Sequence, residues 1–391
     1  MKKVCVVTGS RADYGLLRWV IEGIRDSTKL ELQLVATGMH LSPEFGLTWR
    51  EIEADGLIID RKVETLLSSD TPVGIAKSMG LGMIGFADAY AELEPDLVLV
   101  LGDRYEVFSA AAAAMTACIP IAHLHGGETT EGAIDEAIRH SITKMSQLHF
   151  VATEEYRHRV IQLGEDPARI FLVGGLGVDS ILRLPLLTQA DLEESLGLSF
   201  SKRNLLITFH PETLKPDAAK GQMAELLVSL EQRADTTLIF TMSNADADGR
   251  ILHHMVDDYV EDHADAYAYT SLGQLRYLSC LQYVDGVVGN SSSGLTEVPS
   301  FKKGTINIGD RQKGRVRATS VIDCAPESEA ITRALDRLYS TEFQSALAVV
   351  RNPYGEGGAS SAILEAIEGI STKLLVNKSF FNLDLSVGNQ T

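Results

Sequence analysis

The chain has 391 residues, a formal net charge of -18 and 45% hydrophobic residues. This length exceeds what one hydrophobic core usually organises, so the sequence predicts two domains. The negative charge argues against non-specific binding to nucleic acid, because such binding depends on Lys and Arg that neutralise phosphates. No stretch approaches the roughly 18 uninterrupted apolar residues of a membrane span. We therefore expect a folded globular protein without a nucleic-acid or membrane partner.

The start of the chain and its cysteines bear on the compartment. Residues 1–3 lead directly into a strand-like apolar run, without the pattern of a signal peptide. The four cysteines form no C-x-x-C pair, and several lie in apolar runs, as small core residues do. These features predict a cytoplasmic protein with no zinc knuckle.

Short β-branched runs alternate with longer helix-like segments along the chain. In the first half we expect strands at residues 4–8, 32–37, 97–101, 119–124, 148–152 and 170–173. In the second half we expect strands at residues 205–209, 238–242, 266–270, 286–288 and 305–308. Such alternation is typical of parallel sheets with helices on both faces. The sequence therefore predicts an α/β protein with two doubly wound, Rossmann-like domains.

The connection between the two domains is expected at residues 174–188, which are rich in Gly, Leu and Pro and carry no clear strand. We place the first domain at 1–175, the second at 190–370 and a partly ordered tail at 371–391. Open parallel sheets bind ligands beyond the carboxyl ends of their strands. The active site is therefore expected in the cleft between the domains, among residues that follow strands.

One glycine pattern invites a cofactor interpretation. The G-x-G-x-x-G sequence at residues 80–85 lies inside a helical pattern over residues 73–93 and follows no strand. A dinucleotide fingerprint requires a strand before it and a turn within it. The sequence therefore argues against NAD, and it holds no P-loop motif either. We expect no cofactor.

Charged residues follow the expected strands of the first half. Residues 8–15 place a helix N-terminus and Arg11 where a phosphate can approach, although a simple strand-to-helix turn explains them equally well. Asp103 and Arg104 come directly after the third strand. Neighbours at an extended strand end point in opposite directions, so we expect these two residues to serve different partners.

The fourth strand leads into titratable groups around flexible glycines. His123, His125 and Glu128 lie in the sequence HLHGGE, and Asp135 lies in the helix that follows. Such a cluster suits acid and base chemistry. The two histidines can alternatively share a face of the strand as metal ligands, but the sequence identifies no converging partners. We expect no metal.

The second half offers candidates for phosphate and nucleoside binding. His210 and Asn244 each follow a strand, and a basic loop at residues 311–317 follows another. The strongest segment is residues 289–299, where small hydroxyl residues let backbone N–H groups approach a diphosphate and Glu297 can hold ribose hydroxyls. A capped helix start is compatible with the same residues.

Together these segments resemble the UDP-N-acetylglucosamine 2-epimerases, and more closely the hydrolysing members from bacterial sialic and related nonulosonic acid pathways. The matching segments span residues 8–317 in order and are TGSRADYG, ATGMH, LGDRYE, HLHGGE, DEAIRHSITKMS, FHPET, GNSSSGLTEVP and INIGDRQKGR. The resemblance implies two Rossmann-like domains of the GT-B type with the active site in the cleft. We also expect a homo-oligomer, either a dimer or a tetramer.

The resemblance further implies roles for single residues. Those expected to bind the UDP part of the substrate are Arg11, Arg104, His210, Asn244, Ser291, Ser292, Glu297 and Arg311. Those expected to act in catalysis are Asp103, His125, Glu128, Asp135 and His210. Many family members carry a catalytic carboxylate where this chain has His125, and Asp135 sits one residue further from the glycines than in those members.

The implied reaction removes the C2 proton of a UDP-sugar with loss of UDP, then adds water and reprotonates C2 from the other face. UDP-N-acetylglucosamine would give UDP and N-acetylmannosamine, and UDP-N,N'-diacetylbacillosamine is the alternative substrate. A GT-B glycosyltransferase and a non-hydrolysing epimerase are alternative functions, because both share the fold and the UDP site.

Overall fold

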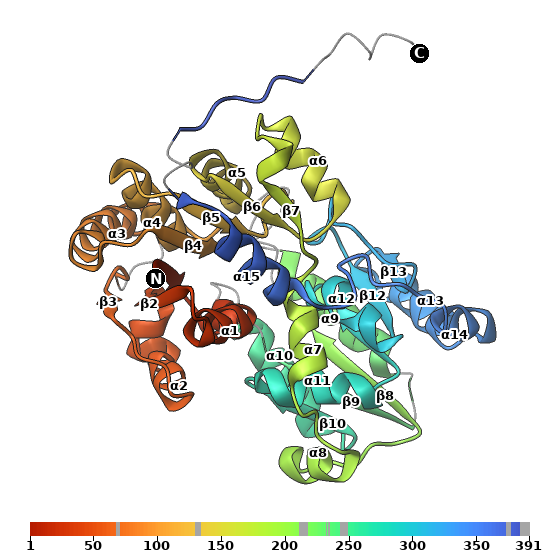
Figure 1. The fold of residues 1–391 in the computed structure, drawn as a ribbon. Helices are drawn as coiled ribbons and strands as arrows, with labels where there is room; N and C mark the ends of the chain where they lie inside the picture. Colours follow the sequence, from red (N-terminus) through yellow and green to blue (C-terminus); the bar gives the residue numbers. More distant parts are fainter. Residues whose placement is uncertain are drawn as a thin grey trace. The chain divides into compact units, whose positions relative to one another are not determined.

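The computed structural model of the protein describes residues 1–67, 71–129, 134–210, 218–231, 233, 235–242, 249–372 and 377–383. The chain divides into two compact units. Unit 1 comprises Met1–Glu128, Ile134–Ser180 and Gly357–Thr391. Unit 2 comprises Thr129–Ala133 and Ile181–Glu356. Each unit is built on its own parallel sheet (Figure 1).

The described part of unit 1 contains a seven-stranded sheet in the order β3-β2-β1-β4-β5-β6-β7. Its strands are β1 (Lys2–Thr8), β2 (Leu30–Thr37), β3 (Arg61–Val63), β4 (Leu97–Leu101), β5 (Ile121–Leu124), β6 (Leu148–Val151) and β7 (Ile170–Leu172). All are parallel. The sequence predicted every one of them except β3, a three-residue edge strand that is too short and polar to show a pattern.

Helices cover both faces of this sheet. They are α1 (Arg11–Asp26), α2 (Trp49–Ala54), α3 (Pro72–Leu93), α4 (Tyr105–Thr116), α5 (Ile134–Met145), α6 (Glu154–Gln162) and α15 (Ala359–Gly369). Helix α7 (Leu176–Arg183) begins in unit 1 and ends in unit 2. Alternation along β1 divides the core: Val4 and Val6 pack with α1 and α15, whereas Cys5 and Val7 pack with α3 and α4. Both faces are buried, which explains the continuous apolar run of β1.

The placement of α15 differs from the expected boundary at residue 370, because this helix packs against α1 within unit 1 (Figure 1). Ile363 and Ile367 enter the core of that unit. The carboxylate of Asp179 also accepts hydrogen bonds from the backbone N–H groups of Gly358 at 2.6 Å and Ser360 at 2.7 Å. Apolar periodicity marks a helix, but it does not say which sheet the helix will cover.

The described part of unit 2 contains a six-stranded parallel sheet in the order β10-β9-β8-β11-β12-β13. Its strands are β8 (Arg203–Thr208), β9 (Thr236–Thr241), β10 (Ala266–Tyr269), β11 (Gly286–Gly289), β12 (Gly304–Ile308) and β13 (Val321–Cys324). Its helices are α8 (Gln189–Leu196), α9 (Ala219–Glu231), α10 (Gly249–Asp262), α11 (Gly273–Tyr283), α12 (Ser293–Thr296), α13 (Ser328–Leu338) and α14 (Thr341–Leu347). Again only the edge strand, β13, was missed.

The strand order reverses at one point in each sheet. The chain builds outward from β1 through β2 to β3 and then returns to β4 on the other side of β1; β8 and β11 are related in the same way. Ligands of doubly wound sheets bind beyond the carboxyl ends of the strands at such switch points. The residues that follow β1 and β4, and those that follow β8 and β11, are therefore the candidates for function.

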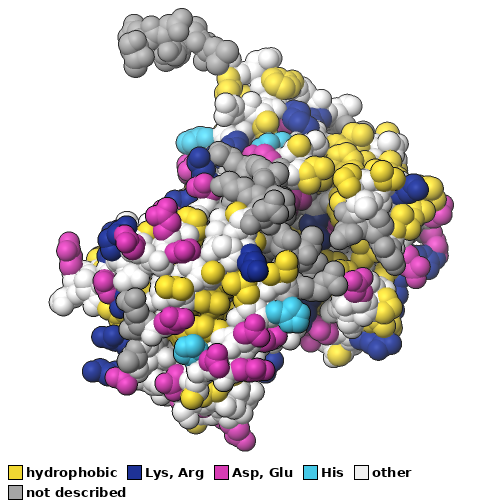
Figure 2. Space-filling view, turned by 180° about the vertical axis from the view of Figure 1, so that it is seen from behind, with side chains coloured by type: hydrophobic (Ala, Val, Ile, Leu, Met, Phe, Trp, Pro, Cys, Tyr) yellow, Lys and Arg dark blue, Asp and Glu magenta, His cyan; other side chains and the backbone are white. Residues whose placement is uncertain are grey.

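Three further observations concern the glycine pattern, the length of the helices and the charge of the surface. The G-x-G-x-x-G sequence lies within the continuous helix α3, as predicted. Among the helices of the described residues, none has the length and apolar character needed to cross a membrane. Figure 2 shows acidic and basic side chains interspersed on the face it presents, without one large basic patch.

Candidate functional site

The turn after β1 packs tightly on the start of α4. A Cβ atom added to Gly9 would lie 2.9 Å from Oε1 of Glu106, so a larger residue here would displace the Glu106 side chain. The hydroxyl of Ser10 accepts a hydrogen bond from the backbone N–H of Asp13 at 3.3 Å and caps α1. Arg11 is the first, exposed residue of that helix. The segment is thus a capped helix start that also presents a cation.

Arg104 and Glu106 form an ion pair beside this turn. Nε of Arg104 donates to Oε1 of Glu106 at 2.7 Å, and the Glu106 side chain is only 1% exposed. The charge of Glu106 raises the pKa of Arg104, which therefore stays protonated. Burial raises the pKa of Asp13 to about 6, although the charge of Arg104 opposes that effect. Two carboxylates and one guanidinium thus meet where β1 and β4 end.

Asp103 and Arg104 do have different partners. Asp103 forms an ion pair with Arg139, whose side chain is 4% exposed. Arg139 projects from the second turn of α5 and also lies 3.8 Å from a carboxylate oxygen of Glu136. A buried guanidinium therefore fixes the carboxylate that follows β4.

Asp135 belongs to the same group of charges. It lies in the first turn of α5 and is half-buried. Burial raises its pKa, and the neighbouring charge of Asp103 raises it further, whereas Arg104 and Arg139 lower it. The structure therefore brings Asp103 and Asp135, predicted from separate motifs, into one electrostatic environment. A carboxylate with a raised pKa beside a fixed ion pair is a candidate for accepting and returning a proton.

His123 is a core residue. Its Nε2 lies 2.8 Å from the carbonyl oxygen of Gly102, and its Nδ1 lies 3.2 Å from the hydroxyl of Thr143. Burial lowers its pKa to about 3, so the ring is neutral, with Nε2–H donating to the carbonyl and Nδ1 accepting from the hydroxyl. Both ring nitrogens are occupied, which leaves no lone pair for a metal. No group of three or more possible metal ligands occurs among the described residues.

His125 and Glu128 form a second pair after β5. Nδ1 of His125 lies 2.9 Å from Oε1 of Glu128, and these side chains are 18% and 6% exposed. Nε2 of His125 is buried and has no hydrogen-bond partner within the described residues. The backbone of His125 has φ of +62°, which is unusual outside glycine, and its N–H donates to the carbonyl of Phe150 at 2.9 Å. Such a strained residue is a candidate for function.

In unit 2, the side chain of Asn290 continues the pairing of β8 with β11 beyond the ends of the two strands. Asn290 is buried; its Oδ1 accepts from the backbone N–H of His210 at 2.7 Å, and its Nδ2 donates to the carbonyl of His210 at 2.8 Å. Gly289 before it has φ of +135°, and a Cβ atom there would lie 1.9 Å from the Thr208 carbonyl oxygen. Only glycine allows this approach. The position of His210 is therefore set by the loop that follows β11.

Two side chains that follow β12 hold the same loop. Arg311 and Gln312 both donate to the carbonyl oxygen of Asn290, at 3.0 Å and 2.8 Å. Burial and, to a smaller extent, the charge of Arg311 lower the pKa of His210 to about 3. His210 is therefore a neutral imidazole near a guanidinium. A neutral imidazole beside a positively charged guanidinium suits the binding of an anionic ligand.

The serine-rich segment forms a compact turn. Ser291 and Ser292 are half-buried and precede α12, which has only four residues. Glu297 immediately follows that helix, and burial raises its pKa, although a hydrogen bond from Ser293 opposes the shift. The hydroxyl of Tyr277 donates to Oγ of Ser293 at 2.8 Å. The predicted residues thus lie in sequence order at the switch point of unit 2.

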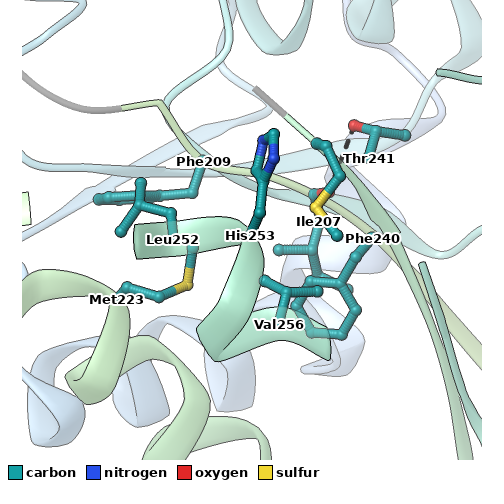
Figure 3. Close-up of a pocket in the computed structure, with 9 residues that line it drawn as sticks. Ile207, Phe209, Met223, Phe240, Thr241, Leu252, His253 and Val256 are labelled. Carbon is teal, nitrogen blue, oxygen red and sulfur yellow. Dashed lines mark hydrogen bonds between the residues drawn. The ribbon is translucent and has the colours of Figure 1, made fainter. Parts of the chain in front are cut away.

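One predicted residue and one cavity stand apart from this description. Asn244 lies outside the residues that the structure describes. Figure 3 shows a small cavity lined mostly by apolar side chains of β8, β9, α9 and α10. Thr241 and His253 supply its polar groups, so it offers no fixed cation for a diphosphate. His253 is half-buried in this lining.

The sequence did not reveal the supporting residues. Arg139, Glu106 and Gln312 hold the predicted groups; each lies in a segment that the sequence singled out, yet none of them was assigned a role. Arg139 carried one signal: it lies four residues after Asp135, on the same helical face. Asn290 lies in the serine-rich segment that the sequence singled out, but its role as a backbone mimic could not be predicted, because that role depends on the pairing of β8 with β11.

Comparison with known proteins gives consistent results. The family model described as UDP-N-acetylglucosamine 2-epimerase matches residues 22–368. A Campylobacter jejuni protein named GDP/UDP-N,N'-diacetylbacillosamine 2-epimerase (hydrolyzing) is 41% identical over 384 residues, which cover 98% of this chain and 99% of that protein. Polysialic acid biosynthesis protein P7 of Escherichia coli is 42% identical over 385 residues, which cover 98% of each.

The solved structures agree on the fold. The crystal structure of UDP-GlcNAc 2-epimerase from Neisseria meningitidis bound to UDP-GlcNAc has a TM-score of 0.82 at 18% identity. The match covers 93% of this chain and 99% of that one. The expected fold class, α/β with two Rossmann-like domains of the GT-B type, is confirmed.

Proposed function

We propose that the chain, which belongs to the UDP-N-acetylglucosamine 2-epimerase family, hydrolyses a UDP-linked 2-acetamido sugar and inverts C2. Its match with a hydrolysing relative over nearly its full length supports this proposal. The observation that carries this proposal is the group of carboxylates after β4 and β5. Asp103 is fixed by Arg139, and Asp135 beside it has a raised pKa. A glycosyltransferase would not need such a group, because it leaves the sugar's C2 untouched.

The reaction balances with water as the only co-reactant. A base takes the proton from C2, the C1–O bond breaks with its electron pair on the UDP oxygen, and a C1–C2 double bond forms. Water then adds to C1, and a proton returns to C2 from the opposite face. Because the C2 proton is weakly acidic, the base must act together with stabilisation of the leaving UDP.

We assign the proton transfers to unit 1. Asp135 is the first candidate for the base, because burial and the charge of Asp103 raise its pKa. His125 takes the place that a carboxylate occupies in many family members. Its contact with Glu128 at 2.9 Å orients the ring and leaves Nε2 for the reacting sugar. An imidazole oriented by a carboxylate is a recurring arrangement for proton transfer in enzymes.

We assign most of UDP binding to unit 2. The serines at 291 and 292 and the backbone around them would meet the diphosphate, Arg311 would supply countercharge, and Glu297 would hold the ribose. Neutral His210, next to Arg311, would donate one hydrogen bond to a phosphate without adding charge. Phosphate groups commonly bind at glycine- and serine-rich turns whose backbone N–H groups point toward the ligand.

Variants of both units test this assignment together. Asp103→Asn, Glu128→Gln and Asp135→Asn should lower kcat by about 100-fold or more, the scale of general acid or base action, while UDP still binds. Ser291→Ala and Arg311→Ala should instead weaken UDP binding, and Arg311 should cost more because a charge-assisted contact is lost. Calorimetric titration of UDP beside a rate assay separates the two outcomes. Carboxylate variants that lose UDP affinity as severely as rate would refute the assignment.

Two sugars are candidates. UDP-N-acetylglucosamine is the first, with N-acetylmannosamine as product. UDP-N,N'-diacetylbacillosamine is the second, and the name of the Campylobacter relative favours it. Measuring kcat/KM for both sugars with one preparation decides between them, because the sugar that is the substrate should be favoured by well over tenfold if the site contacts its C4 group.

A further inference from the structure

The C-terminal segment, residues 377–383, is fastened to the end of α5. Nζ of Lys378 donates to the carbonyl oxygens of Lys144 at 2.7 Å and Ser146 at 2.6 Å, and it lies 3.2 Å from that of Thr143. It also forms an ion pair with Glu165 at 2.7 Å. The last carbonyls of a helix lack partners within the helix and favour a cation. Lys378 therefore serves as the cap of α5.

Other contacts hold the same segment. The backbone N–H of Phe381 donates to the carbonyl of Gly164 at 2.9 Å, and the Phe380 ring packs over Gly164 and under Lys144. Figure 1 shows the segment passing beside α5 and α6. Because Lys378 is only 18% exposed, its ion pair with Glu165 is shielded from solvent. This part of the expected tail thus has defined contacts in unit 1.

Two chains of contacts connect this cap with Asp103. Thr143, in the last turn of α5, places its hydroxyl 3.2 Å from Nδ1 of His123, whose Nε2 donates to the carbonyl of Gly102 at 2.8 Å. That carbonyl belongs to the peptide group that precedes Asp103. One turn before Thr143 on the same helix, Arg139 pairs with the Asp103 carboxylate. The helix that Lys378 caps therefore fixes both the backbone and the side chain of Asp103.

We propose that Lys378 is a positioning residue for the reaction, acting through α5, His123 and Arg139 on Asp103. The proposal rests on the proposed role of Asp103. Without Nζ, Glu165 loses one of its cations, and the last carbonyls of α5 lose their donor. The last turn of α5 then frays, and the hydrogen bonds that place Asp103 become longer or less populated.

Substitutions of Lys378 measure this effect in the full-length chain. Lys378→Met should lower kcat about 3- to 30-fold, the range of coupling through packed networks, while UDP affinity in calorimetry stays unchanged. Lys378→Arg should restore most of the rate. Lys29→Met is the matched control, because it removes another Lys–Glu pair of unit 1, between Nζ and Glu368 at 3.0 Å, that is exposed and not linked to α5.

Coupling to Asp103 distinguishes positioning from simple stabilisation. In the Asp103→Asn background, Lys378→Met should cause little further loss of rate, because both act on one group. Hydrogen exchange provides a readout independent of activity: the amides of residues 102–106 should exchange faster in Lys378→Met than in wild type. A lower melting temperature with unchanged kcat and exchange overturns the proposal. If wild type releases no UDP from either sugar, the proposed function fails, and exchange alone still decides whether Lys378 holds the Asp103 turn.

Discussion

Replacing Arg139 by Met tests the ion pair at the centre of the unit 1 site. The Arg139 side chain is 4% exposed and that of Asp103 20%, so the variant leaves a largely buried carboxylate without its cation. Removing one partner of a buried pair costs about 3–5 kcal/mol, and the partial exposure of Asp103 sets the expected loss at the lower end. For a unit of this size, about 3 kcal/mol lowers the melting temperature by roughly 6–12 °C.

The same substitution should change the pH dependence of the reaction. Burial and the charge of Asp103 raise the pKa of Asp135, whereas Arg104 and Arg139 lower it. Loss of Arg139 raises this pKa further. If Asp135 is the base, the acid limb of kcat/KM then moves to higher pH. Arg139→Lys retains the charge, so it should keep the acid limb in place while losing part of the stability, because Lys lacks the planar fork of Arg.

Two assays read these effects. The chain contains two tryptophans, Trp19 and Trp49, and both lie in unit 1, so their fluorescence follows the unfolding of that unit. UDP release between about pH 5 and 9 gives the rate profile. The double variant Asp103→Asn/Arg139→Met should recover part of the stability, because neither charge is left unpaired. A melting temperature within about 2 °C of wild type and an unmoved acid limb would refute the reasoning.

Two further predictions concern pH and metal. Because burial lowers the pKa of His123 to about 3, below about 6.5 in the unfolded chain, its contribution to stability is present above pH 6.5 and is lost as pH falls toward 3. Urea unfolding followed by tryptophan fluorescence should therefore show that this residue contributes about 2 kcal/mol less to the free energy of unfolding at pH 5 than at pH 8. In His123→Asn the free energy of unfolding should change less with pH, and an equal pH dependence in variant and wild type would contradict the prediction. Chelation by EDTA should leave the rate of UDP release unchanged, since Arg11, Arg311 and backbone N–H groups are expected to neutralise the diphosphate; a rate that EDTA abolishes and a metal restores would oppose this.

The sequence predicted the strands and the strand-end residues because both depend on local patterns. The eleven strands expected from apolar runs all occur. The charged and small residues after β1, β4, β8 and β11 lie at the two switch points, and those after β5 lie one strand further along the sheet of unit 1. The strands that were missed, β3 and β13, lie at sheet edges, where pairing with one neighbour requires no long apolar run.

Long-range partners could not be predicted in the same way. Asp103 and Arg139 are 36 residues apart, and the side chain of Asn290 bonds to His210 across 80 residues. Because the partners of such a pair lie far apart in the sequence, no local pattern indicates that they are in contact in the fold. For the same reason, α15 was assigned to the second domain although Asp179 and α1 hold it in unit 1. His123 was interpreted together with His125, yet only the fold shows that it is a neutral core residue.

The most direct test of the proposed function is an NMR analysis of the products formed in D₂O from UDP-N-acetylglucosamine and from UDP-N,N'-diacetylbacillosamine. Proton removal and return at C2 should give UDP and a free sugar of inverted C2 configuration that carries deuterium at C2. Release of UDP together with a sugar that keeps its C2 proton would contradict the account, as would an inverted sugar still linked to UDP.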